Sequence, residues 1–445
     1  MIKITSKNNC CGCSACAERC PRKCITMESD EEGFLYPRVD ESECSNCGLC
    51  DSVCPFAQPY EARDETETFA AINYDEQVRA NSSSGGIFYL LAENNIAEGG
   101  VVFGAKFTDE WQVEISYAES IEEVKRFMGS KYTQATVGCA YADAERFLKS
   151  GRKVLFSGTP CQIAGLRHFL RKDYAGLTTV DILCHGVPSP NVWGRYIKEL
   201  VQTVREEVNP DKDRYHKKLR KLKFRLATSP KDGTTSAVCI HRDNHYMQAF
   251  LGNLILRPSC YRCKAKEGRS HSDITIADFW GIEKEYPDMF DNKGTSLIII
   301  GSERGEKAID WGKIKATKVQ PQTAKRNGGF SATITIPPNR ATFFAKLNKA
   351  ESVTDLIKET TKLPFLRMAK SSIKYWIKTV LEALQIGKGR TETHFRKNGT
   401  RTIIRKRNIG KVIDIEFRDK RYGWMNFSLV VTFKLNGDTD ACPQK

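Results

Sequence analysis

Eight cysteines near the start of the chain stand in two copies of one spacing. The first copy, C-x2-C-x2-C-x3-C-P, ends at Pro21, and the second ends at Pro55. Three thiolates two residues apart wrap three corners of an iron–sulfur cubane from one loop, whereas the fourth cysteine crosses to the other cubane. The spacing therefore predicts two 4Fe-4S clusters. One is held by Cys10, Cys13, Cys16 and Cys54, and the other by Cys20, Cys44, Cys47 and Cys50.

Zinc is the alternative metal for clustered cysteines. Zinc ribbons use two C-x2-C pairs in one tetrahedral site. They need neither a third cysteine two residues further on nor a crossing Cys-Pro. The repeated frame therefore favours iron–sulfur clusters. Cys11 and Cys24 are left over, and we expect them to pack near the clusters.

Four further cysteines belong to three loops in the middle of the chain. Cys161 follows a predicted strand at 154–157, Cys184 ends another, and Cys260 and Cys263 form a C-x2-C pair. In open α/β sheets the carboxyl ends of strands line the ligand crevice, so Cys161 and Cys184 are expected to face one crevice. Spacing alone leaves three alternatives open. They are a third cluster, a zinc or dithiol site at the C-x2-C pair, and small buried side chains.

Other loops point to the same crevice. The run Ser82-Ser83-Ser84-Gly85-Gly86 precedes a predicted helix at 87–97, and helix N-terminal amides bind phosphate; an ordinary serine cap is the alternative. The loop 129–132 offers a cation and an aromatic ring, although Lys131 can equally be a surface lysine. The aromatic residues of 278–281 either lie beside a flavin or belong to the core.

The elements that must position these loops have an α/β texture. From Phe69 to about Ser302, short β-rich runs alternate with amphipathic helical stretches, which is typical of a sheet covered by helices. In the first block, two β-rich runs flank Gly33 and predict a hairpin. We expect domains at 1–60 and 69–345, and a basic extension at 350–445 to which the sequence assigns no role.

Composition narrows the function classes. The chain has 445 residues and 17 cysteines, ten of them before residue 55. No apolar run follows Met1 and no stretch of about 18 uncharged apolar residues occurs, so we expect a cytoplasmic protein whose cysteines bind metal rather than form disulfides. The patterns G-x-G-x-x-G, G-x-x-x-x-G-K-[ST] and H-E-x-x-H do not occur, which argues against a Rossmann nucleotide site, a P-loop and a metalloprotease.

The net charge of +15 is concentrated at the C-terminal end. Residues 362–445 contain nineteen Lys and Arg against seven Asp and Glu. A predicted helix at 365–386 carries basic and apolar faces. This region either makes a peripheral contact with an anionic membrane or presents a solvated basic face. We expect no nucleic-acid partner.

Several phrases, in order, resemble a known family. They are SSSGGIFYLL, GSKYTQA, KVLFSGTPCQIAGLRHFL, VDILCHGVPSP, LRPSCYRCKAKEGRSHSDITIADFWG and KGTSLIII. Together with the ferredoxin-type block they resemble the beta subunits of coenzyme F(420)-reducing hydrogenases and formate dehydrogenases. The same module resembles that of 7-hydroxymethyl-chlorophyll and divinyl-chlorophyllide reductases. The resemblance covers roughly residues 1–302.

The resemblance implies an iron–sulfur flavoprotein with FAD beside an inner 4Fe-4S cluster. Carried over by position, the ligands of that third cluster are Cys161, Cys184, Cys260 and Cys263. The candidate cofactor contacts are Ser83, Ser84, Gly85, Gly86, Ser130, Lys131, Tyr132, Gly158 and Thr159. The implied fold class is α+β, with a small two-cluster ferredoxin-like domain followed by an α/β flavoprotein domain.

The predicted function is that of a flavin- and iron–sulfur-dependent oxidoreductase. It would pass electrons between an FAD-bound substrate or coenzyme and a low-potential carrier, such as a ferredoxin or another redox partner protein. A non-catalytic electron-transfer subunit is the alternative, and a zinc-dependent nucleic-acid binder is disfavoured by the crossing Cys-Pro frames. The crevice loops favour the enzyme, because a bare relay needs only the first 60 residues. Neither the catalytic residues nor the substrate can be assigned.

Overall fold

The computed structural model describes residues 1–63, 67–207, 245–291, 293–325, 327–361, 392–397, 400–405, 412–419 and 428–432. The chain divides into two compact units, Met1–Thr361 and Lys362–Lys445. The predicted helix at 365–386 and most of the charged segment at 205–225 lie outside the described residues.

The N-terminal block folds as the sequence predicts. Its strands β1 (Ile25–Ser29) and β2 (Leu35–Val39) pair antiparallel, with Ile25 opposite Val39. The turn between them is held by Asp30, whose side chain accepts hydrogen bonds from the amides of Glu32 and Phe34 at 3.1 and 2.8 Å. The remaining elements are η1 (Lys7–Asn9), α1 (Ala15–Arg19) and α2 (Leu49–Ser52).

An eight-stranded sheet forms the centre of the first unit, in the order β10-β3-β9-β8-β7-β6-β4-β5. Only β4, β6, β7 and β8 pair in parallel; the other neighbours are antiparallel. The sheet is therefore mixed. The strands are β3 (Glu67–Asn73), β4 (Val101–Phe107), β5 (Val113–Ala118), β6 (Val154–Gly158), β7 (Leu177–Ile182), β8 (Ile274–Asp278), β9 (Ser296–Ile300) and β10 (Ile314–Lys318).

Helices cover both faces of this sheet, because its strands alternate buried side chains between the two sides. On β4, Val101 and Phe103 pack toward α6 (Ala140–Lys149) and α7 (Pro160–Leu170), whereas Val102 packs toward α4 (Ile87–Ala97). Shorter elements surround the sheet. They are α3 (Glu76–Asn81), α5 (Ile121–Val124), α11 (Ile282–Glu285), η3 (Pro287–Met289), α12 (Glu303–Lys307), η4 (Trp311–Lys313) and α13 (Pro321–Lys325).

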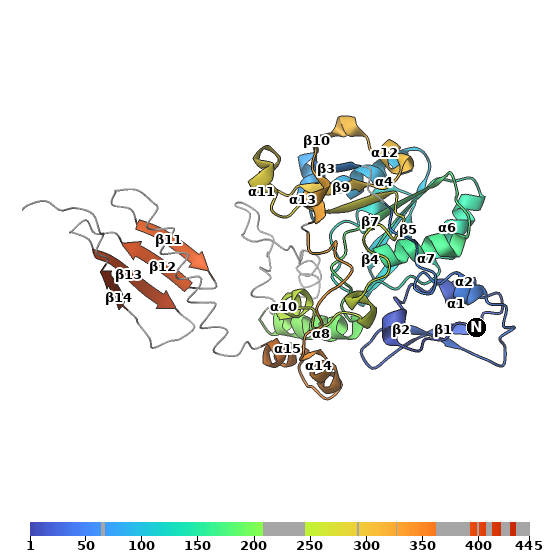
Figure 1. Ribbon diagram of the computed structural model, residues 1–445, viewed down its shortest axis with the longest axis horizontal. Helices are drawn as coiled ribbons and strands as arrows, with labels where there is room; N and C mark the ends of the chain where they lie inside the picture. Colours follow the sequence, from blue (N-terminus) through green and yellow to red (C-terminus); the bar gives the residue numbers. More distant parts are fainter. Residues whose placement is uncertain are drawn as a thin grey trace, which may run out of the picture. The chain divides into compact units, whose positions relative to one another are not determined.

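A helical layer lies beside the sheet (Figure 1) and is built around aromatic side chains. It comprises α8 (Pro190–Glu207), α10 (His245–Leu251), η2 (Pro258–Tyr261), α14 (Arg340–Leu347) and α15 (Val353–Thr361). Trp193, Tyr246 and Phe343 are buried in its core, and Phe34 from the N-terminal hairpin joins them. The helix α15, which lies beyond residue 350, is thus part of the first unit.

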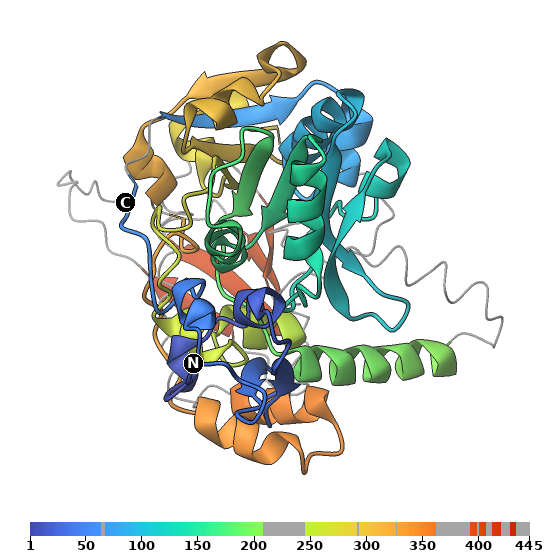
Figure 2. The ribbon, with the colours of Figure 1, turned by 90° about the vertical axis from the view of Figure 1, so that its right-hand side faces the viewer.

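The N-terminal block packs against the helical face of the sheet that carries α6 and α7, as Figures 1 and 2 show. Ala15, Val53 and Phe56 share one buried apolar cluster with Tyr141 and Phe169. Gly165 of α7 permits the closest approach, since a Cβ atom there would lie 3.0 Å from the Cys13 sulfur. The first cysteine loop is therefore seated directly on α7.

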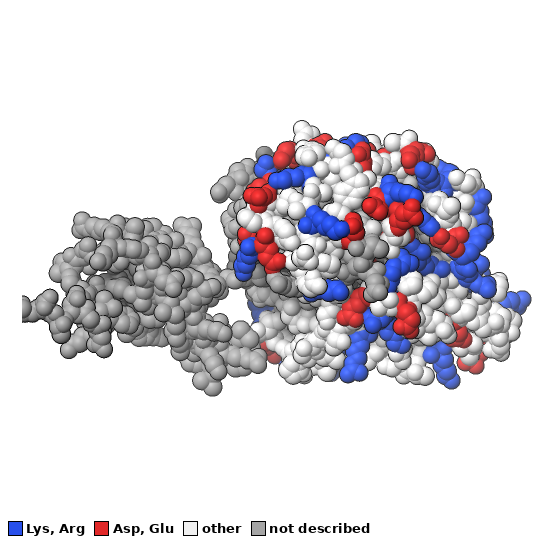
Figure 3. Space-filling view, turned by 45° about the horizontal axis from the view of Figure 1, so that its top comes forward, with Lys and Arg blue, Asp and Glu red and all other residues white. Residues whose placement is uncertain are grey.

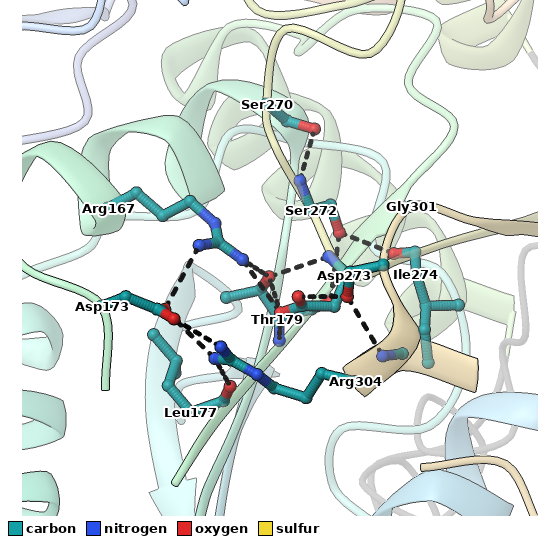
Figure 4. A network of polar contacts seen from close by, with 12 residues as sticks. Arg167, Asp173, Leu177, Thr179, Ser270, Ser272, Asp273, Ile274, Gly301 and Arg304 are labelled. Atoms are coloured by element: carbon teal, nitrogen blue, oxygen red, sulfur yellow. Dashed lines mark hydrogen bonds and ion pairs between the residues drawn. The ribbon is translucent and has the colours of Figure 1, made fainter. Parts of the chain in front are cut away.

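A buried polar network ties α7 to the strands that it covers (Figure 4). The Asp273 carboxylate, which is 3% exposed, accepts from the Thr179 amide at 2.8 Å and from Arg167 at 2.9 Å. It also accepts from the hydroxyl groups of Thr179 and Ser302. A buried carboxylate is tolerated only when such donors satisfy it. The network fixes α7 relative to β7 and β8, the first of which leads into the Cys184 loop.

The second unit contains one antiparallel sheet in the order β11-β12-β13-β14. Its strands are β11 (Glu392–Lys397), β12 (Thr400–Arg405), β13 (Val412–Asp419) and β14 (Ser428–Thr432). On the face of the first unit shown in Figure 3, basic and acidic side chains are interspersed. In the described parts of the chain, we find no helix with the length and apolarity needed to cross a membrane.

Candidate iron–sulfur and cofactor site

The first predicted ligand set comes together around the loop before α1. Cys16 interacts electrostatically with Cys10, Cys13 and Cys54, and Cys54 with Cys10 and Cys13. Burial raises the pKa of Cys54 to about 11, so this thiol keeps its proton until a metal replaces it. The structure thus brings the crossing cysteine to the three loop cysteines that the spacing assigns to it.

The second predicted set lies at the outer end of the block. The thiols of Cys20 and Cys24 are 3.4 Å apart, and Cys24 also interacts with Cys44. The Cys50 sulfur accepts a hydrogen bond from the Ile2 amide at 3.1 Å. Cys47 is solvent-exposed. Cys24, which the spacing leaves over, therefore lies next to two members of this set.

The four mid-chain cysteines also converge, and we call them the inner tetrad: Cys161, Cys184, Cys260 and Cys263. Cys184 interacts electrostatically with the other three thiols, and Cys263 interacts with Cys161 and Cys260. All four are half-buried. The tetrad is assembled because β6 and β7 are adjacent parallel strands whose carboxyl ends meet at one edge of the sheet, and η2 closes the third side.

Cys161 has a distinct electrostatic environment. It is the second residue of α7, whose capping box at Thr159 and Pro160 at the first turn fix the helix start. A hydrogen bond from Cys11, and a second from Thr159, lower the pKa of Cys161 to about 7. The helix N-terminus favours the thiolate in the same direction. In the tetrad, Cys161 is thus the thiol prepared to be an anion.

Cys11 connects the two cysteine centres. It is buried and hydrogen-bonds to Cys13 of the first set and to Cys161 of the inner tetrad. The sequence indicates only that Cys11 is spare. In the structure, it is a direct side-chain link between the N-terminal block and the crevice.

A pocket of about 570 Å³ opens at the carboxyl ends of the parallel strands, a volume typical of cofactor sites. Cys184 forms part of its wall, so the pocket and the inner tetrad share a side chain. Eight of the nine candidate cofactor contacts also line it. These are Ser83, Ser84, Gly86, Ser130, Lys131, Tyr132, Gly158 and Thr159.

Gly85 is the exception among the candidate contacts. A Cβ atom at Gly85 would lie 2.4 Å from the Ala71 carbonyl oxygen, so the residue is a close-packed support rather than part of the wall. The two predicted loops meet through Ser83 and Ser130, because the Ser83 hydroxyl accepts from the Ser130 amide at 2.8 Å. Both loops therefore border one pocket, with the N-terminus of α4 opening into it.

Lys131 has a structural contact set. Its ammonium donates to the carbonyl oxygens of Arg126, Phe127, Met128 and Gly129 at 2.9 to 3.1 Å. Burial lowers its pKa to about 7, whereas the four carbonyl oxygens favour the charged form. The lysine thus holds its own loop in shape at the pocket wall.

The sequence leaves the aromatic residues of 278–281 undecided between pocket and core, and the structure divides them. Trp280 lines the pocket and is 47% exposed, whereas Phe279 is buried in a separate apolar cluster. Ile182 also lines the pocket and is 46% exposed. The lining residues that sequence reasoning missed include His185, Phe250 and Asn327; they come from distant loops and carry no motif.

The described residues give no preformed site for a single metal ion, since no three His, Cys, Asp or Glu side chains among them group closely enough. The donor chemistry fits a cluster instead. Each set offers four thiols, and a 4Fe-4S cluster takes four cysteine thiolates, one on each iron.

Comparison with known families agrees with this arrangement. Residues 9–57 match the family described as "4Fe-4S dicluster domain". Residues 151–324 match the family of the C-terminal part of coenzyme F420 hydrogenase/dehydrogenase beta subunits. The chain therefore combines a 4Fe-4S dicluster domain with a domain that belongs to the coenzyme F420 hydrogenase/dehydrogenase family. The predicted family and the predicted 4Fe-4S chemistry of the first block are confirmed.

Two curated relatives are similar over parts of the chain. One is the F-type polypeptide of the F(420)H(2) dehydrogenase of Methanosarcina mazei, 29% identical over 179 residues, which are 38% of this chain and 50% of that protein. The other is the coenzyme F420-dependent sulfite reductase of Methanocaldococcus jannaschii, 28% identical over 194 residues, which are 42% of this chain and 29% of that protein. The chain thus spans half or less of the length of these relatives.

Among solved structures, the chain is similar to a chain of the F420-reducing [NiFe] hydrogenase complex from Methanosarcina barkeri. The identity is 17% and the TM-score is 0.39, over 68% of this chain and 92% of that chain.

Proposed function

We propose that the chain is an iron–sulfur flavoprotein oxidoreductase. It passes electrons between a substrate or coenzyme at an FAD in the crevice pocket and a low-potential carrier, through three 4Fe-4S clusters. The observation that carries this proposal is Cys184, which belongs both to the pocket wall and to the inner tetrad. A bare relay has no need of a cofactor-sized pocket against a cysteine tetrad.

The chain's own residues supply the order of the centres. The inner tetrad lies against the pocket, and Cys11 links it to the first cysteine set through Cys13. The crossing cysteines, Cys20 and Cys54, join the first set to the second. Cys47 of the second set reaches the surface, so the proposed docking point of the carrier protein is the loop around Cys47.

The pocket wall divides into a polar and an apolar part. The serine–glycine loop and the N-terminus of α4 offer amides for a phosphate group. Ile182 and Trp280 offer apolar surface for a ring system. When bound, FAD exchanges electrons in pairs with a substrate and singly with a cluster.

Both curated relatives carry coenzyme F420 in their names. Reduced coenzyme F420 is therefore the first electron donor to test. Direction of flow is decided by the potentials of the centres.

The test is flavin analysis of the anaerobically purified chain and of a variant with a filled pocket. We expect about one FAD per chain in the unmodified protein. Ile182→Trp places a larger ring in the pocket from an exposed position, so it should lower the FAD content at least tenfold without unfolding the chain. Ile336→Trp is the matched control, because Ile336 is 56% exposed and does not line the pocket.

Each outcome decides between the functions. Loss of FAD in Ile182→Trp alone supports the flavoprotein. Full cluster content without any flavin in the unmodified chain would favour the non-catalytic electron-transfer role. Zinc without acid-labile sulfide would rule out both.

A further inference from the structure

Arg257 lies between the N-terminal block and the inner tetrad and is completely buried. Its Nε donates to the Cys10 carbonyl oxygen at 2.8 Å, and one terminal nitrogen donates to the Gln134 side chain at 3.1 Å. The other terminal nitrogen donates to the Leu35 carbonyl at 2.8 Å and lies 3.6 Å from the Cys10 sulfur. The guanidinium also stacks over the Tyr36 ring at 4.4 Å.

None of these partners is a carboxylate. Other buried arginines of the first unit are paired: Arg79 with Asp291, and Arg340 with Glu32. An uncompensated buried charge is costly, so an anion must face Arg257 in the functional protein. The groups within its electrostatic reach include thiols of the cysteine sets.

These thiols belong to two different centres. Arg257 favours the thiolate of Cys10 in the first set, and it favours the thiolates of Cys161 and Cys260 in the inner tetrad. Gly12 makes the close seating possible, because a Cβ atom there would lie 2.7 Å from the guanidinium. One buried cation is thereby shared between two cysteine sets.

Lys266 provides a contrast within the same site. It is 4% exposed and donates to the carbonyl oxygens of His185 and Ser331 at 3.2 and 3.1 Å. Its charge reaches Cys184, Cys260 and Cys263. These three thiols all belong to the inner tetrad, so Lys266 acts on one centre where Arg257 acts on two.

We propose that Arg257 is a positioning residue that raises the reduction potentials of two neighbouring clusters together, the inner cluster and the cluster of Cys10, Cys13, Cys16 and Cys54. Each one-electron reduction adds one negative charge to a cluster, and a buried cation stabilises the reduced form. Because the same charge serves both clusters, their potentials stay matched. This inference rests on the proposed presence of three clusters.

The experiment is a potentiometric titration of the anaerobically purified full chain, monitored by electron paramagnetic resonance. Arg257→Met removes the charge and keeps the apolar stem. It should lower two cluster potentials, each by at least the equivalent of a tenfold change in the reduction equilibrium, about 59 mV for one electron. The third potential should not move. Arg257→Lys keeps the charge and should restore most of both shifts.

Two further variants separate the roles. Lys266→Met should lower one of the same two potentials and leave the other unchanged. Arg79→Met removes a buried arginine that a carboxylate balances; it should destabilise the chain and leave all three potentials in place. If Arg257→Met loses its clusters, Arg257→Gln gives the same neutral test, and cluster loss in both neutral variants but not in Arg257→Lys also supports the role of the charge.

The contradicting results are equally defined. Unchanged potentials in Arg257→Met, or equal shifts in Arg257→Met and Arg257→Lys, would overturn the inference. An unmodified chain without an inner cluster would instead overturn the proposed function, so the two failures are distinguishable by its iron content.

Discussion

Cys11 shows how a residue outside the ligand spacing gains a role from its neighbours. It donates to Cys161, and this bond is the largest cause of the lowered Cys161 pKa. Above a pH of about 7 the hydrogen bond stabilises a thiolate at the start of α7. The anion is then in place before any iron arrives, which favours cluster assembly at the inner tetrad.

Replacing Cys11 by Ala should therefore raise the Cys161 pKa toward the ordinary value of a thiol. In the iron-free chain, alkylation of Cys161 by iodoacetamide, followed by mass spectrometry, should show a midpoint near pH 7 for the unmodified protein. The midpoint should rise in Cys11→Ala and stay in Cys24→Ala. An identical pH profile in all three proteins would show that Cys11 does not tune Cys161.

Single residues also mark where sequence reasoning ends. The twelve proposed ligands could be identified because eight of them follow the spacing that cluster chemistry imposes and four lie in phrases typical of the family. The roles of Cys11 and Arg257 could not, since each depends on burial against segments far away in the chain. An arginine three residues before Cys260 carries no spacing signal of its own.

At the scale of elements, α7 is the part that joins the two domains of the first unit. Its N-terminus presents Cys161, its middle bears Gly165 against the Cys13 loop, and Arg167 anchors it to Asp273. One helix therefore sets the separation between the first cluster set and the inner tetrad.

Gly165→Ala should weaken this contact. The added Cβ atom would lie 2.8 Å from the Tyr141 hydroxyl oxygen and 3.0 Å from Cys13, so overpacking should cost about 1–3 kcal/mol, more than the helix propensity of about 1 kcal/mol that alanine restores. The free energy of unfolding, measured by anaerobic urea denaturation, should fall.

Gly194→Ala on α8 is the matched control. Its added Cβ atom would meet only the end of the flexible Gln112 side chain, at 3.1 Å, so stability should stay level or rise. Equal effects of the two substitutions would mean that the space at Gly165 is not what seats the cysteine loop.

The elements themselves were largely predictable. The hairpin around Gly33, the helix Ile87–Ala97 and the strands before the cysteine loops lie where the periodicity places them. The antiparallel pairing of β3, β8 and β9 was not predictable, because a buried apolar run such as Ser296–Ile300 reads the same in either direction. The mixed sheet nevertheless keeps the parallel strands that carry the loops of the tetrad together.

At the scale of the whole molecule, the first unit arranges its cysteine centres in series from a buried pocket to an exposed loop. The inner tetrad borders the pocket through Cys184, and Cys47 lies at the surface. The sequence shows both ends of this series. Their connection through the seating of the N-terminal block on α7 emerges only from the fold.

The most direct test of this arrangement is the iron and acid-labile sulfide content of the full chain, compared with that of the double variant Cys260→Ser/Cys263→Ser. Three four-iron clusters predict roughly twelve iron atoms per unmodified chain and roughly eight in the variant, with the two clusters of the N-terminal block intact by electron paramagnetic resonance. An unchanged iron content in the double variant would contradict the inner cluster and the electron path that depends on it.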